Sequence, residues 1–202
     1  DGAERIIEAG ADAIKVGVGP GSMCITRQIA GVGVPQFTAV LQTAEVGHQH
    51  GVPVIADGGI RASGDIAKAM GAGASTVMLG TMLAGTDESP GFFILRNGRK
   101  MKVARGMAST EAAVGRAIRD DPSVGWARLE SAESEVAAEG IQAPVPHRGS
   151  ADEVFQHLLA GLRSAMSYCD AENIEQMWGN AKFVRQTESG IREAGQPDQD
   201  SY

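Results

Sequence analysis

Three short apolar segments recur in the first part of the chain, and each runs directly into a glycine-rich loop. They lie at residues 12–18, 53–57 and 76–79. The pattern predicts helices at 1–10, 37–50 and 64–70, with Ser63 as the N-cap of the last one. Strands that alternate with helices in this way form βαβ units, in which neighbouring strands are parallel. The sequence therefore predicts an α/β fold with a parallel sheet.

Residues suited to ligand binding follow each of the three predicted strands. They are Cys24, the Asp-Gly-Gly run at 57–59, and the pair Gly80 and Thr81. In a (β/α)8 TIM barrel this end of the strands carries the active site, often with a phosphate. Backbone amides of glycine-rich loops approach anions closely, although each loop alone is also typical of a tight turn. A barrel needs eight strands, so we expect only its C-terminal part here, unless the fold is smaller.

Cys24 lies in a loop with three glycines and a proline, just after the first strand. A cysteine on such a support is suited to be a nucleophile. The alternative is a buried, inert structural cysteine. Cys169, at the end of a long predicted helix, is expected to be the inert one. With two cysteines and no CxxC motif, a reduced, cytoplasmic protein is expected.

Charge and hydropathy exclude several classes of function. The net charge is −7 and no basic run is present, so no nucleic-acid surface is expected. No apolar run is long enough to span a bilayer and no signal peptide is recognisable, so no membrane partner is expected. The four histidines have no companion carboxylate cluster, so they do not predict a metal site.

The periodicity changes after the third strand. Asn97-Gly98 between apolar runs predicts a β-hairpin. Residues 106–140 are poor in large apolar side chains and are interpreted as a mobile flap with transient helix. An amphipathic helix is predicted at 150–166, with an inner face of Val154, Leu158, Leu159, Leu162 and Met166. The one domain, 1–202, ends with a short helix at 173–178, a short strand at 181–185 and a polar tail at 188–202, which is expected to be disordered unless a partner orders it.

A series of motifs runs through nearly the whole chain in one order. They are GPGSMCITR at 19–27, GVGVPQ at 31–36, ADGGI at 56–60, VMLG at 77–80, AGTDESPG at 84–91, RGM at 105–107, EGI at 139–141, GLRS at 161–164 and FVR at 183–185. Together they resemble the IMP dehydrogenase / GMP reductase family. The resemblance implies a (β/α)8 barrel, of which this chain is the C-terminal portion.

The resemblance also implies a reaction and the residues that perform it. Cys24 would attack C2 of a purine nucleotide, and hydride would pass between that carbon and NAD, or NADP in a reductase. Thr26 would help handle the water or ammonia chemistry. Arg128 is the nearest candidate for the flap arginine that activates water, and Glu139 would contact the base or protonate ammonia. The implied substrate-binding residues are Asp57 for the ribose, Ser22, Gly59, Gly80 and Thr81 for the 5′-phosphate, and Gly106, Met107 and Glu139 for the base. Gly17 and Gly19 would contact the cofactor.

A monovalent-cation site is implied as well. Its ligands would be the carbonyls of Gly19, Gly21 and Cys24, and a neighbouring subunit of a homotetramer would complete it with Glu193, Ala194 and Gly195. Potassium dependence is expected on this basis.

Several departures from the family pattern bear on the reaction. The upstream cofactor-binding segments are absent from the chain, any CBS pair would also lie upstream, and Ala104 replaces a tyrosine that commonly contacts the phosphate. Dehydrogenases usually carry an Arg-Tyr pair in the flap, whereas this chain has Arg128-Leu129. That change favours GMP reductase, while the 85–91 segment and residues 167–169 favour IMP dehydrogenase, which is the leading prediction.

Two alternative functions remain for the chain: a different phosphate-binding barrel enzyme, or a binding module that catalyses no reaction. The chain alone is expected to be inactive. Ligands would be IMP, XMP or GMP.

Overall fold

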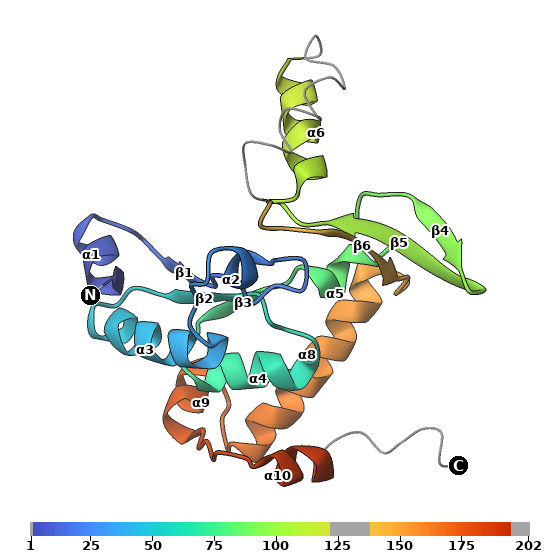
Figure 1. Cartoon of the computed structure of the whole chain (residues 1–202). Coiled ribbons are helices and arrows are strands. Elements are labelled where there is room, and N and C mark those ends of the chain that lie inside the picture. Colours follow the sequence, from blue (N-terminus) through green and yellow to red (C-terminus); the bar gives the residue numbers. More distant parts are fainter. Residues whose placement is uncertain (1, 122–137, 195–202) are drawn as a thin grey trace, which may run out of the picture.

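The fold joins a small parallel sheet to a small antiparallel one (Figure 1). The structure, a computed structural model, describes residues 2–121 and 138–194. The parallel strands are β1 (Ile14–Val16), β2 (Val54–Asp57) and β3 (Thr76–Met78), in the order β1-β2-β3. Val16 pairs with Ala56, and Ala56 with Val77. The predicted α/β class and parallel pairing are therefore confirmed for the described chain.

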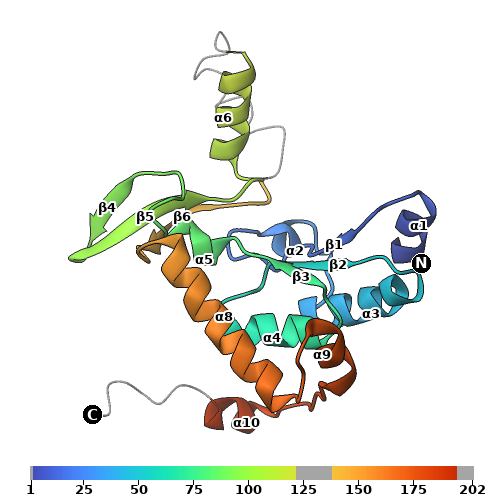
Figure 2. The ribbon, with the colours of Figure 1, turned by 180° about the vertical axis from the view of Figure 1, so that it is seen from behind.

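Most helices lie on one side of this parallel sheet, as the two opposite views show (Figures 1 and 2). The strands contact α1 (Gly2–Glu8), α3 (Gln36–Gln49) and α4 (Ser63–Gly71). A second layer, α8 (Ala151–Tyr168) and α9 (Ile174–Asn180), packs on α4, and α10 (Glu188–Glu193) follows. The main buried cluster joins α4, α8 and α9 through Ile66, Met70, Val154, Leu158, Leu162 and Met177, together with Met82. Burying this apolar surface is what fixes α8 across α4.

One glycine permits the close crossing of α4 and α8. A Cβ built on Gly161 would lie 2.2 Å from Ser63 Oγ and 2.3 Å from Ser63 Cβ. Ser63 therefore faces α8 and does not cap its own helix, contrary to the prediction. Ala62 occupies the N-cap position, and Asp65 Oδ2 accepts from the backbone N–H groups of Arg61 and Ala62 at 3.0 and 3.2 Å.

The second sheet is antiparallel and contains β4 (Phe93–Arg96), β5 (Arg99–Arg105) and β6 (Gln142–Pro146). Asn97 and Gly98 join β4 to β5 with φ of 51° and 72°, as a type I′ turn requires, so the predicted hairpin is confirmed. The third strand, β6, was not predicted. Its two prolines are uncommon in strands, so the sequence does not predict one here, and they are tolerated because β6 lies at the edge of the sheet.

Helix α6 (Thr110–Asp120) projects away from the two sheets (Figures 1 and 2). The Ser109 hydroxyl caps it by accepting from the Ala112 N–H at 3.2 Å. It lies in the segment predicted as a flap with transient helix, of which residues 122–137 are outside the described chain.

Other local predictions were wrong. Residues 181–185 form no strand, and the tail begins as helix α10. Leu159 is 45% exposed and does not join the inner face of α8. Two one-turn helices, α2 (Thr26–Ile29) and α5 (Thr81–Ala84), follow the loops after β1 and β3 and were missed because one turn carries no periodic signal.

In the described residues, no helix combines the length and the apolar character needed to cross a membrane.

Candidate active site

The loops that follow β1, β2 and β3 meet at one end of the parallel sheet. Gly58 and Gly59 have φ of 85° and 81°, so the chain after β2 turns in a way that favours glycine. A Cβ on Gly58 would lie 3.0 Å from Pro20 Cγ and 3.3 Å from Gly21 N, which shows that this turn packs on the cysteine loop. The residues predicted from their positions after the strands are thus brought together.

The cysteine loop is held in place by the chain that returns from the flap. Cys24 and Gly140 form an antiparallel bridge, the Ile25 N–H donates to Glu139 O at 2.8 Å, and the Ile141 N–H donates to Met23 O at 2.9 Å. This pairing carries the Glu139 side chain to the cysteine, although the two residues are far apart in sequence.

A short chain of side-chain hydrogen bonds starts at the cysteine. The Thr26 hydroxyl donates to Glu139 Oε2 at 2.7 Å, and Cys24 Sγ lies 3.1 Å from Thr26 Oγ1. A hydroxyl has one hydrogen, and here it is committed to the carboxylate. The Cys24 thiol is therefore the donor to Thr26. The result is a directed path from thiol to hydroxyl to carboxylate.

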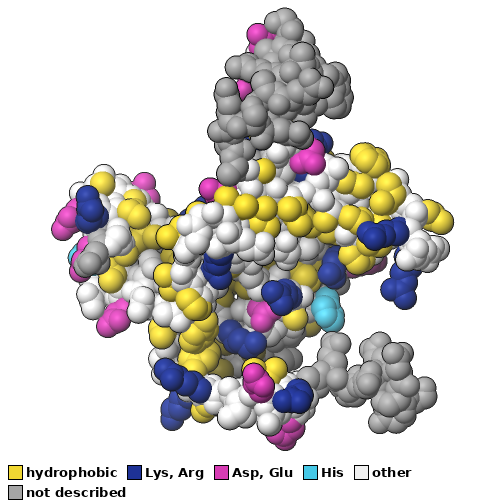
Figure 3. Space-filling view, viewed as in Figure 1, with side chains coloured by type: hydrophobic (Ala, Val, Ile, Leu, Met, Phe, Trp, Pro, Cys, Tyr) yellow, Lys and Arg dark blue, Asp and Glu magenta, His cyan; other side chains and the backbone are white. Residues whose placement is uncertain are grey.

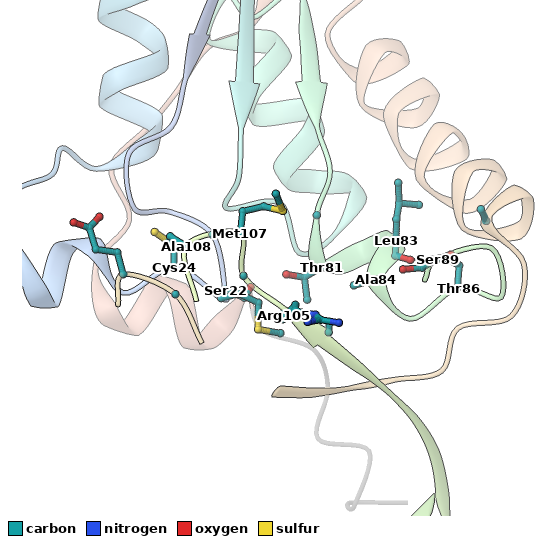
Figure 4. Close-up of a pocket in the computed structure, with 18 of the residues that line it drawn as sticks. Ser22, Cys24, Thr81, Leu83, Ala84, Thr86, Ser89, Arg105, Met107 and Ala108 are labelled. Carbon is teal, nitrogen blue, oxygen red and sulfur yellow. Dashed lines mark hydrogen bonds between the residues drawn. The ribbon is translucent and has the colours of Figure 1, made fainter. Parts of the chain in front are cut away.

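A cavity of about 640 Å³ opens beside Cys24 (Figure 4). Cys24 and Ala108 lie on one side, Thr81 near the middle, and Leu83, Thr86 and Ser89 on the other side. The predicted site residues that line it are Gly21, Ser22, Cys24, Gly80, Thr81, Gly106, Met107 and Glu139. Its size is in the range of small-molecule sites, and its few polar groups lie among apolar ones.

Other predicted site residues lie outside this lining. Asp57 ends β2 and forms an ion pair with Lys15 Nζ at 2.5 Å. Gly59 borders a second, smaller cavity of about 120 Å³. Gly17 packs against Asp57, since a Cβ there would lie 2.0 Å from Asp57 O.

The expected cation ligands are only partly brought together. Gly19 has φ of 82°, and Gly21 O already accepts from the Cys24 N–H at 3.0 Å, which leaves a second lone pair. Glu193 and Ala194 lie at α10, far from the cysteine loop of the same chain (Figure 1). Among the described residues, no group of three or more His, Cys, Asp and Glu side chains could hold a metal. Gly195 and Arg128 lie outside the described residues.

Lys15 and Lys102 were missed by the sequence reasoning. Lys15 alternates with apolar residues in a three-residue strand, so nothing in the pattern pointed to its pairing with Asp57. Lys102 is 1% exposed, and its ammonium donates to the carbonyls of Thr86, Asp87 and Ser89. It thereby holds the loop on the far wall of the cavity.

An exposed acid–base pair lies next to this loop. His147 Nε2 is 2.8 Å from Asp87 Oδ1. The hydrogen bond from His147 lowers the pKa of Asp87, and the positive charges of Lys100 and Lys102 act in the same direction. The pair joins the loop to the end of β6.

Comparison with known proteins finds one family model and close relatives that cover nearly the whole chain. Residues 1–196 match the model of the IMP dehydrogenase / GMP reductase domain. The chain is 50% identical over 193 residues to the inosine-5′-monophosphate dehydrogenase of Nitrosopumilus maritimus, covering 96% of this chain and 40% of that protein. It is 48% identical over 199 residues to the GMP reductase of Leishmania donovani, covering 98% of this chain and 39% of that protein.

A solved structure is similar over the same region. It is a Cys-to-Ala variant of GMP reductase from Trypanosoma brucei in complex with guanosine 5′-monophosphate, 49% identical with a TM-score of 0.87, covering 96% of this chain and 38% of that one. The chain thus spans about 40% of the length of the curated relatives it matches.

Proposed function

Because the chain belongs to the IMP dehydrogenase / GMP reductase family, we propose that it carries the nucleophile and the nucleotide site of a purine-nucleotide oxidoreductase. The observation that carries the proposal is the path from Cys24 through Thr26 to Glu139, beside a cavity of about 640 Å³. Cys24 attacks C2 of the purine and forms a covalent adduct, which divides a difficult substitution into two easier steps.

The hydrogen-bond path explains how the attack begins. The thiol proton moves to the Thr26 hydroxyl as the Thr26 proton moves to Glu139. The products are a Cys24 thiolate and a protonated Glu139. The thiolate adds to C2, while Glu139 retains one transferable proton close to the reacting carbon.

This stored proton favours the reductive direction, from GMP to IMP. The 2-amino group of GMP must leave as ammonia, which requires a proton. Glu139 can return one through Thr26, so that the C–S bond forms as the C–N bond breaks and the charges balance. In the oxidation of IMP, the hydrolysis step must instead take a proton from water, so Glu139 would first have to return its proton to the departing Cys24 thiolate. Arg128-Leu129, without the tyrosine of the dehydrogenase pattern, agrees with this direction.

Oxidation of IMP to XMP is the second candidate. The sequence segment at 85–91 favours it, and dehydrogenases match the chain as closely as reductases do.

The nucleotide itself is proposed to lie between the strand ends and Arg105–Met107. Asp57, held by Lys15, is suited to ribose hydroxyls. The Gly80 amide and the Ser22 and Thr81 hydroxyls at the cavity beside Cys24 are suited to a phosphate, with the Gly59 amide at the smaller cavity as a further donor. GMP is the ligand in the similar T. brucei structure, which supports this assignment.

A nicotinamide dinucleotide would supply or accept the hydride in either reaction. Gly17 and Gly19, the expected contacts of this cofactor, pack instead against Asp57 and Arg27.

The completed barrel, the potassium ion and the homotetramer are proposals of the same kind. The ion would bind the carbonyls of Gly19, Gly21 and Cys24, with Glu193–Gly195 supplied by a neighbour. The distance of α10 from the cysteine loop supports a ligand set shared between subunits. Exposed apolar residues at the antiparallel sheet, Leu95 on β4 at 80% and Phe92 just before β4 at 65%, support association (Figure 3).

The test compares both directions in protein extended upstream of Asp1 to the length of its relatives. GMP with NADPH should give IMP and ammonia, whereas XMP and NADH from IMP with NAD⁺ would establish the second candidate. Cys24→Ser should abolish either activity and spare nucleotide binding. Turnover that survives Cys24→Ser would refute the covalent mechanism.

A further inference from the structure

The side chain of Gln36 bridges the two strands that lead into the site. Gln36 is the first residue of α3, and its Nε2 donates to Val16 O at 2.8 Å and to Asp57 O at 3.1 Å. Val16 is the last residue of β1 and Asp57 the last of β2. One amide group therefore binds both strand ends.

The orientation of this amide is determined by its two acceptors. Its oxygen, Oε1, is buried and has no hydrogen-bond partner in the described part of the chain. Turning the amide over would place this oxygen against two carbonyl oxygens, and both donated bonds would be lost. Both N–H groups are thus committed to joining the strands.

The parallel ladder stops at the same place. The last pair of the β1–β2 register is Val16 with Ala56, and beyond it the two chains stay in close contact but lead in different directions. One enters the loop that carries Cys24, and the other enters the turn at Gly58 and Gly59. Past the last ladder pair, the two chains are held by close packing and by the two hydrogen bonds of the Gln36 amide.

We propose that Gln36 is a positioning residue that sets the cysteine loop relative to Asp57, so that the nucleophile and the ribose-binding carboxylate act on one nucleotide. The inference rests on the proposed function, because that function requires Cys24 and Asp57 to contact the same nucleotide. Gln36 touches neither the thiol nor the cavity beside it, so its effect passes through the backbone of Val16 and Asp57.

The matched variants are Gln36→Glu and, as a control, Gln42→Glu on the exposed part of α3. Glutamate has the shape of glutamine, but when ionised it has no hydrogen to donate and would oppose two carbonyl oxygens. Protonated glutamate donates one hydrogen bond and restores half of the bridge. Around this position the other ionisable groups are Asp57 with Lys15, and Asp65 and Lys68 across the small cavity.

The readout is protection of Cys24 from iodoacetamide by GMP, mapped by mass spectrometry on the extended protein. For Gln36→Glu, the GMP concentration that half-protects Cys24 should rise about 10–100-fold at neutral pH, because two donated hydrogen bonds are lost and a carboxylate faces two carbonyl oxygens. Gln42→Glu should change it by about twofold or less. The alkylation rate without nucleotide should stay near that of wild type in both, because Ile25 and Ile141 still pair the cysteine loop.

Lowering the pH towards about 5, where a carboxyl begins to take up protons, should restore part of the protection in Gln36→Glu alone. This recovery in the same molecules separates positioning from misfolding. Wild-type-like protection in Gln36→Glu would overturn the inference and leave the proposed function standing. If GMP and IMP both fail to protect wild-type Cys24, the proposed function falls, and with it the purpose assigned to Gln36.

Discussion

Replacing Lys102 with methionine should loosen the far wall of the cavity and destabilise the fold. The side chain is 1% exposed, and its ammonium donates to Thr86 O at 2.6 Å, to Asp87 O at 3.2 Å and to Ser89 O. Methionine keeps most of the volume and removes all three donors. The loop that it holds also supplies Glu88, whose carboxylate accepts from the Ala151 N–H at 2.8 Å at the start of α8.

The size of the loss in unfolding free energy depends on how far water can reach each carbonyl oxygen once the ammonium is removed. The bond to Thr86 O is buried, so this oxygen loses its partner outright, which costs about 1–3 kcal/mol. The bonds to Asp87 O and Ser89 O are only partly buried, so water replaces part of their loss. We therefore expect the free energy of unfolding to fall by about 2–4 kcal/mol, a large share of ordinary stability.

Urea denaturation followed by far-UV circular dichroism measures this change. Lys100→Met is the matched control, because Lys100 lies on the same strand with its ammonium exposed, 3.8 Å from the centre of the Phe93 ring. An exposed cation–π contact is worth about 0.5–1 kcal/mol. Equal losses in the two variants would show that burial and the three carbonyls do not stabilise the loop as argued.

Three further outcomes follow from the geometry. Thr26→Val should lower kcat about 10²–10⁴-fold in a steady-state assay, because it removes the hydroxyl that relays the proton. Thr26→Ser keeps the hydroxyl and should retain most of the activity. A fully active valine variant would exclude the path. Gly161→Ala should lower the free energy of unfolding by about 1–3 kcal/mol because its Cβ would overlap Ser63, measured by urea denaturation, and Ser63→Gly should relieve it. Because the pKa of Asp87 is lowered in the folded state, Asp87 contributes stability above its unfolded-state pKa, and this contribution is lost as the pH falls through the folded-state pKa. His147→Ala should therefore flatten the acid end of a pH–stability profile. An unchanged profile would contradict this.

Local patterns in the sequence were enough to predict the three parallel strands and the hairpin. Each parallel strand is an apolar run that ends in glycines, and Asn97-Gly98 meets the φ requirement of its turn directly. Strand β6 escaped notice because Pro144 and Pro146 mask its pattern. Ser63 was misassigned because a serine before a helix is a good cap in isolation, while here α8 lies against it.

For the site, residue types and spacing singled out Cys24, and the resemblance added Thr26 and Glu139. Only the tertiary structure decided that the thiol, hydroxyl and carboxylate form one directed path, because the Cys24–Gly140 bridge brings Glu139 across a separation of 113 residues to Thr26. The buried ammonium of Lys102 and the bridging amide of Gln36 were equally invisible in sequence. Short-range signals such as φ preferences and apolar periodicity can be read along a chain, whereas a polar partner that lies on another element is chosen by packing.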